Sequence, residues 1–360
     1  MYRQTNEKTM TDTAGRDVAV VGAGAGAAAA TFVVDSAAPE AKITVLEKSG
    51  GLCGRAATRR RGNVTYDYGA NYVKDEDERV VSVLTETLDT DGLVDIPEPI
   101  YTFDATGTVS EGRASESRKW TYRRGLTQIA KRLFGRTDAT VHRRTRIATI
   151  GRTESKAWRL VDTDGVEWGP FEALVLNPPA PQTATLLRES EWTGPVRDAL
   201  VEAVERVAYR TVWTAVLHYD FELDVPYYAL VNPGKDHEVG WIAREECKPG
   251  HVPPGESLLV VQANHKWSRE HYDEAPATNV AMLAEHAAEI LDDERLLDPN
   301  WTDHQGWRYA LPENGVASGP LDSTEREGLY CVGDWVAGEA RVHAAVANGL
   351  DVGERLVSRL

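Results

Sequence analysis

The stretch DVAVVGAGAGA at positions 17–27 decides the fold of this chain of 360 residues. The residues before Gly22 form an apolar run that is typical of a strand buried on both faces. An alanine-rich segment follows to about Ser36 and favours a helix, and residues 41–46 form a second apolar run that ends before Glu47. A strand, a helix and a strand within about thirty residues predict a parallel sheet with a right-handed crossover.

Glycine and alanine alternate at positions 22–27, where the predicted strand meets the predicted helix. Gly22 allows a tight turn, Gly24 lets the backbone approach a diphosphate, and Ala27 is small enough for the helix to pack on the strand. Glu47 stands 25 positions after Gly22, close to the roughly 20 expected of a carboxylate that accepts ribose hydroxyls. The pattern predicts a dinucleotide site, and a Gly/Ala-rich turn beside a surface glutamate is the alternative.

Two further motifs lie close behind, EKSGGLCGR at 47–55 and YDYGANY at 66–72. They resemble the flavin-binding amine oxidase superfamily, in which such loops wrap the diphosphate and isoalloxazine of FAD. The pair GD at 333–334, followed by RV at 341–342 and a predicted helix, resembles the closing motif of that family. The resemblance implies that Asp334 takes a ribityl hydroxyl. It also implies that the helix N-terminus faces the flavin C2 carbonyl, where negative charge accumulates on reduction.

The resemblance implies that FAD is the cofactor and that it is bound non-covalently. Glycine amides and the Arg55 guanidinium would neutralise its diphosphate, and residues 145–147 match the strand whose backbone contacts adenine. Two residues depart from the family pattern, because Cys53 stands where glycine is frequent and Asn177 where a smaller residue is commoner. We expect these residues to bind the cofactor: Gly22, Ala23, Gly24, Gly26, Ala27, Glu47, Lys48, Gly54, Arg55, Asp67, Gly69, Ala70, Asn71, Arg146, Ile147, Gly333, Asp334, Arg341 and Val342.

The sequence predicts an α/β fold, α+β overall, with the two-domain architecture of flavin amine oxidases. A Rossmann-type FAD-binding domain with a parallel sheet would comprise residues 16–75, 120–180 and 322–360. An inserted substrate domain with a mixed sheet would comprise residues 76–119 and 181–321, where longer alternating strands and most of the tryptophans occur. Residues 140–150, 158–162 and 166–168 predict a small antiparallel meander. Residues 1–15 are interpreted as a flexible leader.

Four segments of the second predicted domain narrow the family resemblance: WIAR at 241–244, CKPG at 247–250, KWS at 266–268 and WRYA at 307–310. They resemble the renalase-like branch, whose members oxidise misreduced isomers of nicotinamide dinucleotides. The resemblance implies hydride transfer from a reduced dinucleotide to flavin N5, with oxygen as the reoxidant.

Hydride transfer depends on positioning and desolvation more than on an ionised base. We therefore select Asn71 and Tyr72, which follow the flavin loop, and Trp307 and Tyr309, on a candidate pocket strand, as catalytic candidates. Core packing explains such aromatic residues at least as often. Lys266 could resemble the lysine that holds water at N5 in amine oxidases, but an exposed surface lysine is the favoured interpretation.

The alternatives are an amine oxidase or a desaturase on the same scaffold, and a flavin-carrying protein that binds a partner without turnover. An amine oxidase would cage a primary amine between aromatic residues. A desaturase would carry an apolar face for membrane docking.

Composition excludes several classes of protein. Asp and Glu number 56 against 40 Lys and Arg, which gives a net charge of −16 and argues against nucleic acid. The sequence has no apolar run of about 18 residues, which a membrane-spanning helix would require. The three cysteines are too far apart for a disulfide scaffold. The nine histidines predict no metal site. We expect a cytoplasmic protein whose acidic, lysine-poor composition suits concentrated salt.

Overall fold

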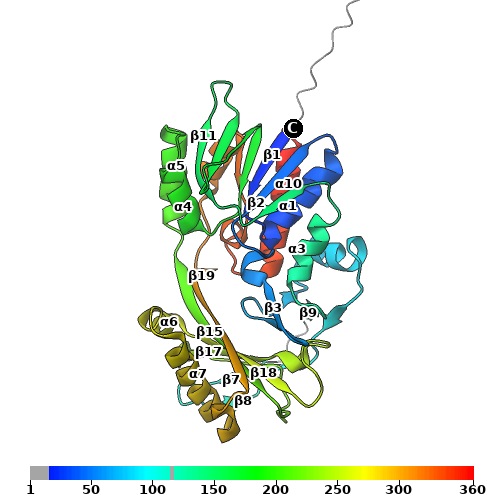
Figure 1. The fold of residues 1–360 in the computed structure, drawn as a ribbon, viewed down its shortest axis with the longest axis vertical. Coiled ribbons are helices and arrows are strands. Elements are labelled where there is room, and N and C mark those ends of the chain that lie inside the picture. Colours follow the sequence, from blue (N-terminus) through cyan, green and yellow to red (C-terminus); the bar gives the residue numbers. More distant parts are fainter. Residues whose placement is uncertain (1–15, 114–116) are drawn as a thin grey trace, which may run out of the picture.

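The computed structural model describes residues 16–113 and 117–360, so the predicted leader at 1–15 lies outside the described residues. The chain forms two lobes, and two long antiparallel strands, β15 (Tyr209–Tyr219) and β19 (Trp301–Pro312), run from one lobe into the other (Figure 1). Within the described residues, no helix is both long enough and apolar enough to cross a membrane.

The first lobe is built on a five-stranded sheet in which every pairing is parallel. Its inner strands are buried on both faces, which explains their continuous apolar runs. The predicted strand–helix–strand motif around Gly22 is confirmed, because the first two strands are neighbours joined by helix α1 (Ala25–Ala37). In spatial order the strands are β10 (Thr140–Arg143), β2 (Lys42–Glu47), β1 (Asp17–Val21), β14 (Ala173–Leu176) and β20 (Leu329–Cys331).

Strand β10 corrects the prediction that residues 140–150 belong to an antiparallel meander. It pairs parallel to β2 at the edge of the five-stranded sheet. Because an edge strand is partly exposed, β10 lacks the continuous apolar run of the inner parallel strands, and its sequence resembles that of an antiparallel strand. The meander itself consists of β11 (Ile147–Arg152), β12 (Trp158–Asp162) and β13 (Glu167–Phe171).

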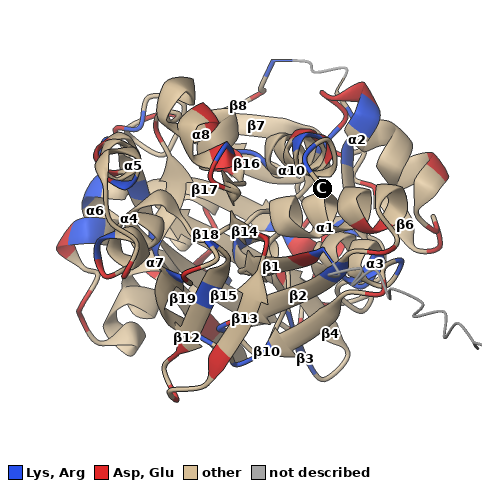
Figure 2. Cartoon of the chain, turned by 90° about the horizontal axis from the view of Figure 1, so that it is seen from above, with Lys and Arg blue, Asp and Glu red and all other residues tan. Residues whose placement is uncertain are grey.

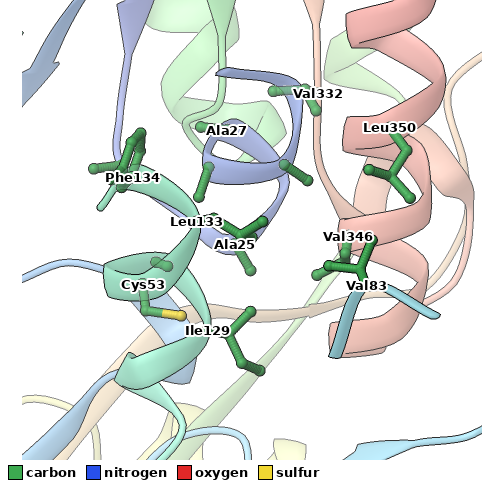
Figure 3. Close-up of a cluster of buried hydrophobic side chains, with 14 of the residues drawn as sticks. Ala25, Ala27, Cys53, Val83, Ile129, Leu133, Phe134, Val332, Val346 and Leu350 are labelled. Atoms are coloured by element: carbon green, nitrogen blue, oxygen red, sulfur yellow. The ribbon is translucent and has the colours of Figure 1, made fainter. Parts of the chain in front are cut away.

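Helices cover both faces of the parallel sheet. On one face α1, α3 (Thr127–Phe134) and α10 (Val342–Val357) share a core in which Ala25, Ile129 and Val346 gather (Figure 3). On the other face α4 (Ala180–Arg188) and α5 (Pro195–Glu205) share a core with the meander. Helices α8 (Ser318–Glu325) and α9 (Asp334–Ala337) flank strand β20. The parallel sheet is therefore a buried central layer.

The lobes do not divide at the predicted boundaries near residues 76 and 181. Helix α2 (Glu78–Ser82) and the π-helical turn Val83–Thr87 pack into the core of the first lobe, as do α4 and α5 into its other core. A three-stranded sheet of β5 (Val73–Lys74), β9 (Lys119–Tyr122) and β6 (Leu93–Asp95) lies beside them. The sequence pattern of an amphipathic helix reveals its apolar face, but it does not reveal which lobe packs against that face.

The second lobe carries a mixed seven-stranded sheet, as predicted, with one parallel pairing between β16 and β7. Helices α6 (His265–Glu270) and α7 (Pro276–Leu291) cover one face, and the 3₁₀ turn Glu294–Leu297 follows them. The turn Glu245–Cys247 lies between two strands of this sheet. The spatial order is β19, β15, β18 (Ser257–Ala263), β17 (Val239–Arg244), β16 (Ala229–Val231), β7 (Ile100–Phe103) and β8 (Val109–Ser110).

Strand β19 is an edge strand whose outer carbonyls are occupied by arginines from the first lobe. Arg55 lies in the 3₁₀ turn Gly54–Ala56, and β3 (Thr58–Arg61) and β4 (Val64–Asp67) form the next hairpin. Arg55 donates to the carbonyl of Ala310 (3.0 Å), and Arg59 donates to that of His304 (2.9 Å). Arg61 donates to the carbonyl of Thr302 (3.4 Å). These three residues cover the free edge of the second sheet.

Candidate cofactor and substrate site

A cavity of about 1050 Å³ lies between the lobes, at the carboxyl ends of the parallel strands. This edge is where open α/β sheets bind their ligands. The glycine-rich segments of the first lobe form one wall, and residues 305–311 of β19 form the opposite wall. The volume stands at the upper end of the range for small-molecule sites, as a site for a cofactor together with a substrate requires.

The N-terminus of α1 opens into this cavity. No side chain caps the helix at Gly24, and Gly24, Ala25 and Gly26 all line the wall. Gly22 takes a positive φ of +94°, which turns the chain sharply from β1 into the helix. Because uncapped N–H groups and the helix dipole attract anions, the residues present fit a dinucleotide diphosphate.

Asn177, which departs from the family pattern, braces this turn. Its Oδ1 accepts from the Gly24 N–H (2.9 Å), and its Nδ2 donates to the carbonyl of Val332 (2.9 Å). A Cβ on Gly24 would lie 2.4 Å from Asn177 Oδ1. A smaller residue at position 177 would leave both backbone groups without this partner.

Glu47 is held rigidly at the end of β2, where the dinucleotide pattern places the ribose of the adenosine. Its two carboxylate oxygens accept from the N–H groups of Ala23 and Ser49, each at 2.7 Å. Each oxygen keeps a further lone pair, so the carboxylate can still accept a ribose hydroxyl. The neighbouring Lys48 donates to Gln182 (3.1 Å), and burial followed by the charge of Arg146 lowers its pKa.

Arg55 and Asp334 form a bidentate ion pair in the cavity wall, with contacts of 2.8 and 2.7 Å. Burial opposes the charge on Arg55, but the interactions with Asp334 and Tyr209 together raise the guanidinium pKa. The family resemblance assigned these two residues to separate parts of FAD. With its bond to Ala310, Arg55 donates three hydrogen bonds, which leaves two of its five N–H groups for a diphosphate.

Most residues selected from the sequence lie in the cavity wall. Thr145 and Arg146 do so from the connection between β10 and β11 and not from a strand. The selected residues in the wall are Gly22, Ala23, Gly24, Gly26, Glu47, Lys48, Gly54, Arg55, Gly69, Ala70, Arg146, Ile147, Trp307, Tyr309, Gly333, Asp334, Arg341 and Val342.

Four selected residues do not line the cavity. For Asp67, Asn71 and Tyr72 the prediction of a side chain facing the cofactor or substrate is corrected, whereas Ala27 has the helix-packing position that its small size predicts. Ala27 lies beneath the first turn of α1, where it packs in the core. Asp67 is fully buried among polar partners. Asn71 donates to the carbonyl of Gly69 (3.2 Å), and Tyr72 packs against Tyr228 and Trp241. Neighbouring positions in a loop do not share a direction, so adjacency to the flavin motif misplaced these side chains.

The interpretation of Lys266 as an exposed surface lysine agrees with the structure. Lys266 is exposed on α6 and does not line the cavity, so it does not take the position of a lysine at flavin N5. Cys331 is buried in β20, and burial raises the pKa of its thiol to about 12.

The sequence interpretation missed the polar side chains on the second-lobe side of the cavity: Arg59, Tyr68, Gln262, Tyr272, Gln305 and Arg308. One of them had a usable signal, because Gln262 ends the otherwise apolar run 258–261. Its Nε2 donates to the carbonyl of Gly69 (2.8 Å). The others come from strand edges and a loop, where polar residues are ordinary.

Aromatic and cationic groups alternate on this side of the cavity. The rings of Tyr68 and Trp307 stack with centroids 5.3 Å apart and planes at 20°. The Arg59 guanidinium lies 4.1 Å from the centre of the Tyr68 ring, and Arg308 lies 4.3 Å from that of Tyr272. The charged residues in the cavity wall are six basic ones, Lys48, Arg55, Arg59, Arg146, Arg308 and Arg341, and three acidic ones, Glu47, Glu189 and Asp334.

Comparison with known families agrees with this geometry. Residues 105–357 match the family described as flavin containing amine oxidoreductase, and residues 20–87 match the NAD(P)-binding Rossmann-like domain. The chain belongs to the flavin-containing amine oxidoreductase family. It is an FAD-dependent oxidoreductase.

Solved structures share the whole fold at low sequence identity. A protein assigned as a protoporphyrinogen oxidase from Exiguobacterium is 14% identical, with a TM-score of 0.76 over 96% of this chain and 99% of that one. Cyclohexylamine oxidase from Brevibacterium oxydans is 11% identical, with a TM-score of 0.71 over 96% and 99%. A fatty acid isomerase from P. acnes is 14% identical, with a TM-score of 0.68 over 95% and 98%. Their different reactions make the cavity, and not the fold, the guide to the substrate.

Proposed function

We propose that this enzyme oxidises a reduced isomer of a nicotinamide dinucleotide, as the renalase-like motifs of the second lobe imply. When bound, FAD supplies the two-electron acceptor for the substrate hydride, and molecular oxygen restores it with release of hydrogen peroxide. The chain itself has to bind the substrate, orient its reduced ring and exclude water.

The observation that carries the proposal is the charge of the cavity wall. Six basic and three acidic residues line it, whereas the whole chain has a net charge of −16. The FAD diphosphate accounts for only part of this positive charge, because Arg59 and Arg308 lie at the far end, beside Tyr68 and Tyr272. Basic groups at both ends favour a substrate that brings phosphates of its own.

Arg308 is the residue better placed to bind such a phosphate. Arg59 is already committed to Asp303 (2.9 Å) and Gln305 (2.8 Å). Arg308 has one carboxylate neighbour, Asp273 at 3.8 Å, and its side chain is 57% exposed. Its guanidinium therefore keeps its donors for a ligand that enters along β19.

Amine oxidation is the second candidate, and the aromatic residues argue against it. Tyr68 and Trp307 stack directly on each other, with ring centres 5.3 Å apart, which leaves no gap for an amine between the two faces. A protonated amine would also meet the guanidinium groups of Arg59 and Arg308. Amine oxidases hold a water at flavin N5 with a lysine. Among the described residues that line the cavity, Lys48 is the only lysine, and it lies at the adenosine end.

Mixing the purified flavoprotein anaerobically with 2- or 6-dihydro-NAD(P) tests the proposal. We expect the visible flavin absorbance to disappear with these dinucleotides and to persist with primary amines. Arg308→Gln should raise the KM for the dinucleotide by up to about fivefold with little change in kcat, because an exposed charge contact is worth about 0.2–1 kcal/mol. Arg269→Gln, on the exposed surface of α6, is the matched control.

The outcomes separate the candidates. Bleaching by amines alone would replace the proposal with amine oxidation. A flavin that neither dinucleotides nor amines reduce would contradict both and would favour a flavin-carrying protein without turnover.

A further inference from the structure

Four ionisable side chains between the lobes are completely buried. Asp67 ends β4, and Glu245, Lys248 and His251 belong to the second-lobe segment that contains the CKPG motif; each is 0% exposed. The Lys248 ammonium lies 2.6 Å from Glu245 Oε1 and 3.2 Å from Asp67 Oδ2. Buried charges persist only when they are paired, so each charged group of this cluster requires a partner of opposite charge.

His251 balances the cluster. Its Nδ1 lies 2.8 Å from Glu245 Oε2, and its Nε2 lies 2.9 Å from the carbonyl of Tyr122. Carbonyl and carboxylate oxygens both accept hydrogen bonds, so each ring nitrogen faces an acceptor, which is the arrangement that suits an imidazolium with two N–H donors. Two cations then face two anions. Burial opposes ionisation of Asp67, but Lys248 and His251 hold its pKa below the usual range.

A metal ion does not fit this cluster. Asp67, Glu245 and His251 offer ligand atoms within 4.8 Å of one another. The Lys248 ammonium, however, already contacts both carboxylates, so a metal ion would have to bind beside a positive charge within its own ligand set.

The cluster acts on a segment of the cavity wall. Glu245 Oε2 accepts from the N–H of Asp67 (3.0 Å), the residue at which the segment 67–70 begins. The next carbonyls accept from second-lobe side chains, that of Tyr68 from Trp307 (3.1 Å) and that of Gly69 from Gln262 (2.8 Å).

Segment 67–70 is also anchored to the first lobe. The N–H of Ala70 donates to the carbonyl of Arg55 (3.0 Å), and Asp67 Oδ1 accepts from Leu126 (2.9 Å). Every residue of the segment is therefore fixed by a partner outside it, and Gly69 and Ala70 line the cavity.

We propose that Lys248 and His251 are positioning residues that hold segment 67–70 against the FAD site through Asp67 and Glu245, so that the second lobe sets the position of the cofactor-facing wall. The proposal rests on the FAD site of the family and not on the identity of the substrate. A negative result with dihydronicotinamide substrates would therefore leave it standing.

The test compares Lys248→Met with Lys266→Met, the same change at an exposed lysine. Purified holoenzymes are compared in their visible flavin spectrum and in the rate at which FAD is released on dilution. We expect Lys248→Met to shift the flavin bands and to release FAD roughly tenfold faster, because a carboxylate that fixes the wall loses its cation. Behaviour equal to that of Lys266→Met would overturn the proposal.

A double variant separates positioning from stability. Lys248→Met combined with Asp67→Asn removes one cation and one anion, so the remaining pair of Glu245 and His251 is neutral. We expect the thermal midpoint to recover toward that of the native chain while FAD release stays fast. Recovery of both would show that the cluster only stabilises the fold, and would overturn the positioning role.

Discussion

Asn177 ties the first turn of the dinucleotide site to the end of β20 with one planar amide. Its oxygen serves Gly24 and its nitrogen serves Val332, both at 2.9 Å. An amide carries an acceptor and a donor side by side in one planar group, so a single side chain satisfies both backbone groups. The departure from the family pattern at this position therefore has a structural reason that the sequence did not reveal.

Asn177→Asp tests this reason with almost no change in shape. The carboxylate still accepts from Gly24, but it faces the carbonyl of Val332 with no donor and adds negative charge beside the diphosphate site. We expect the Kd for FAD to rise roughly tenfold, because an unsatisfied buried group costs about 1–3 kcal/mol. FAD binding is measured by flavin fluorescence.

Asn300→Asp provides the control, because Asn300 Oδ1 also accepts from a backbone N–H, that of Asp220 (2.9 Å), away from the cavity. Equal FAD binding by the two variants would mean that Asn177 plays no part in the cofactor site.

At the scale of elements, α1 and α10 approach so closely that glycine is required between them. A Cβ on Gly349 would lie 2.2 Å from the carbonyl oxygen of Gly26, and one on Gly353 would lie 2.6 Å from Val33 Cβ. Both helices begin at the cavity, where Gly24, Ala25, Arg341 and Val342 line the wall. Their packing therefore sets the distance between the two helix N-termini.

Gly349→Ala should reverse the usual effect of this substitution. Alanine in a helix interior stabilises a protein by roughly 0.5–1 kcal/mol relative to glycine. Here the added methyl meets a backbone oxygen that cannot move alone, and overpacking costs about 1–3 kcal/mol. We expect a lower free energy of unfolding in urea and weaker FAD retention.

The control is Gly319→Ala in α8, where an added Cβ meets nothing within 4 Å. It should not lower the free energy of unfolding, and it should leave FAD retention unchanged. A Gly349→Ala variant as stable as this control would disprove the close-packing argument.

The sequence was most informative where one segment carries its own signal. The apolar run before Gly22, the glycines after it and the GD pair at 333–334 fixed the first lobe and most of the cofactor wall. It was least informative where partners lie far apart along the chain. Nothing local indicates that α2 packs on the first lobe, that Asp67 turns toward Lys248 or that Arg59 reaches β19.

At the scale of the whole molecule, charge is distributed unevenly. Acidic and basic segments are interspersed over the molecule (Figure 2). Three arginine stretches that lie far apart in the sequence, at 59–61, 123–124 and 143–144, nevertheless come together around Lys131. Partial burial and the charges of Arg60, Arg124 and Arg143 together lower the pKa of Lys131. Because these basic residues are gathered in one place, the rest of the surface carries a larger excess of acidic residues than the net charge of −16 alone suggests.

Salt should stabilise such a molecule. Raising NaCl from about 0.01 M to 1 M shortens the screening length from about 30 Å to 3 Å, which weakens repulsion among the excess carboxylates. A gain of about 1 kcal/mol would raise the midpoint of thermal unfolding by roughly 2–4 °C. Scanning calorimetry in NaCl and KCl measures it. Screening predicts the same rise in both salts, and a fall would mean that the ion pairs outweigh the repulsion.

The arginines on the free edge of β19 have a consequence for solubility. An uncovered edge strand offers unpaired carbonyls and N–H groups to any other chain, and so provides a template for aggregation. Arg55, Arg59 and Arg61 occupy that edge, and they belong to the segment that also forms the cofactor wall. Mutations that disorder this segment would expose the edge of β19 to other chains. We therefore expect loss of FAD and aggregation into insoluble protein to occur together.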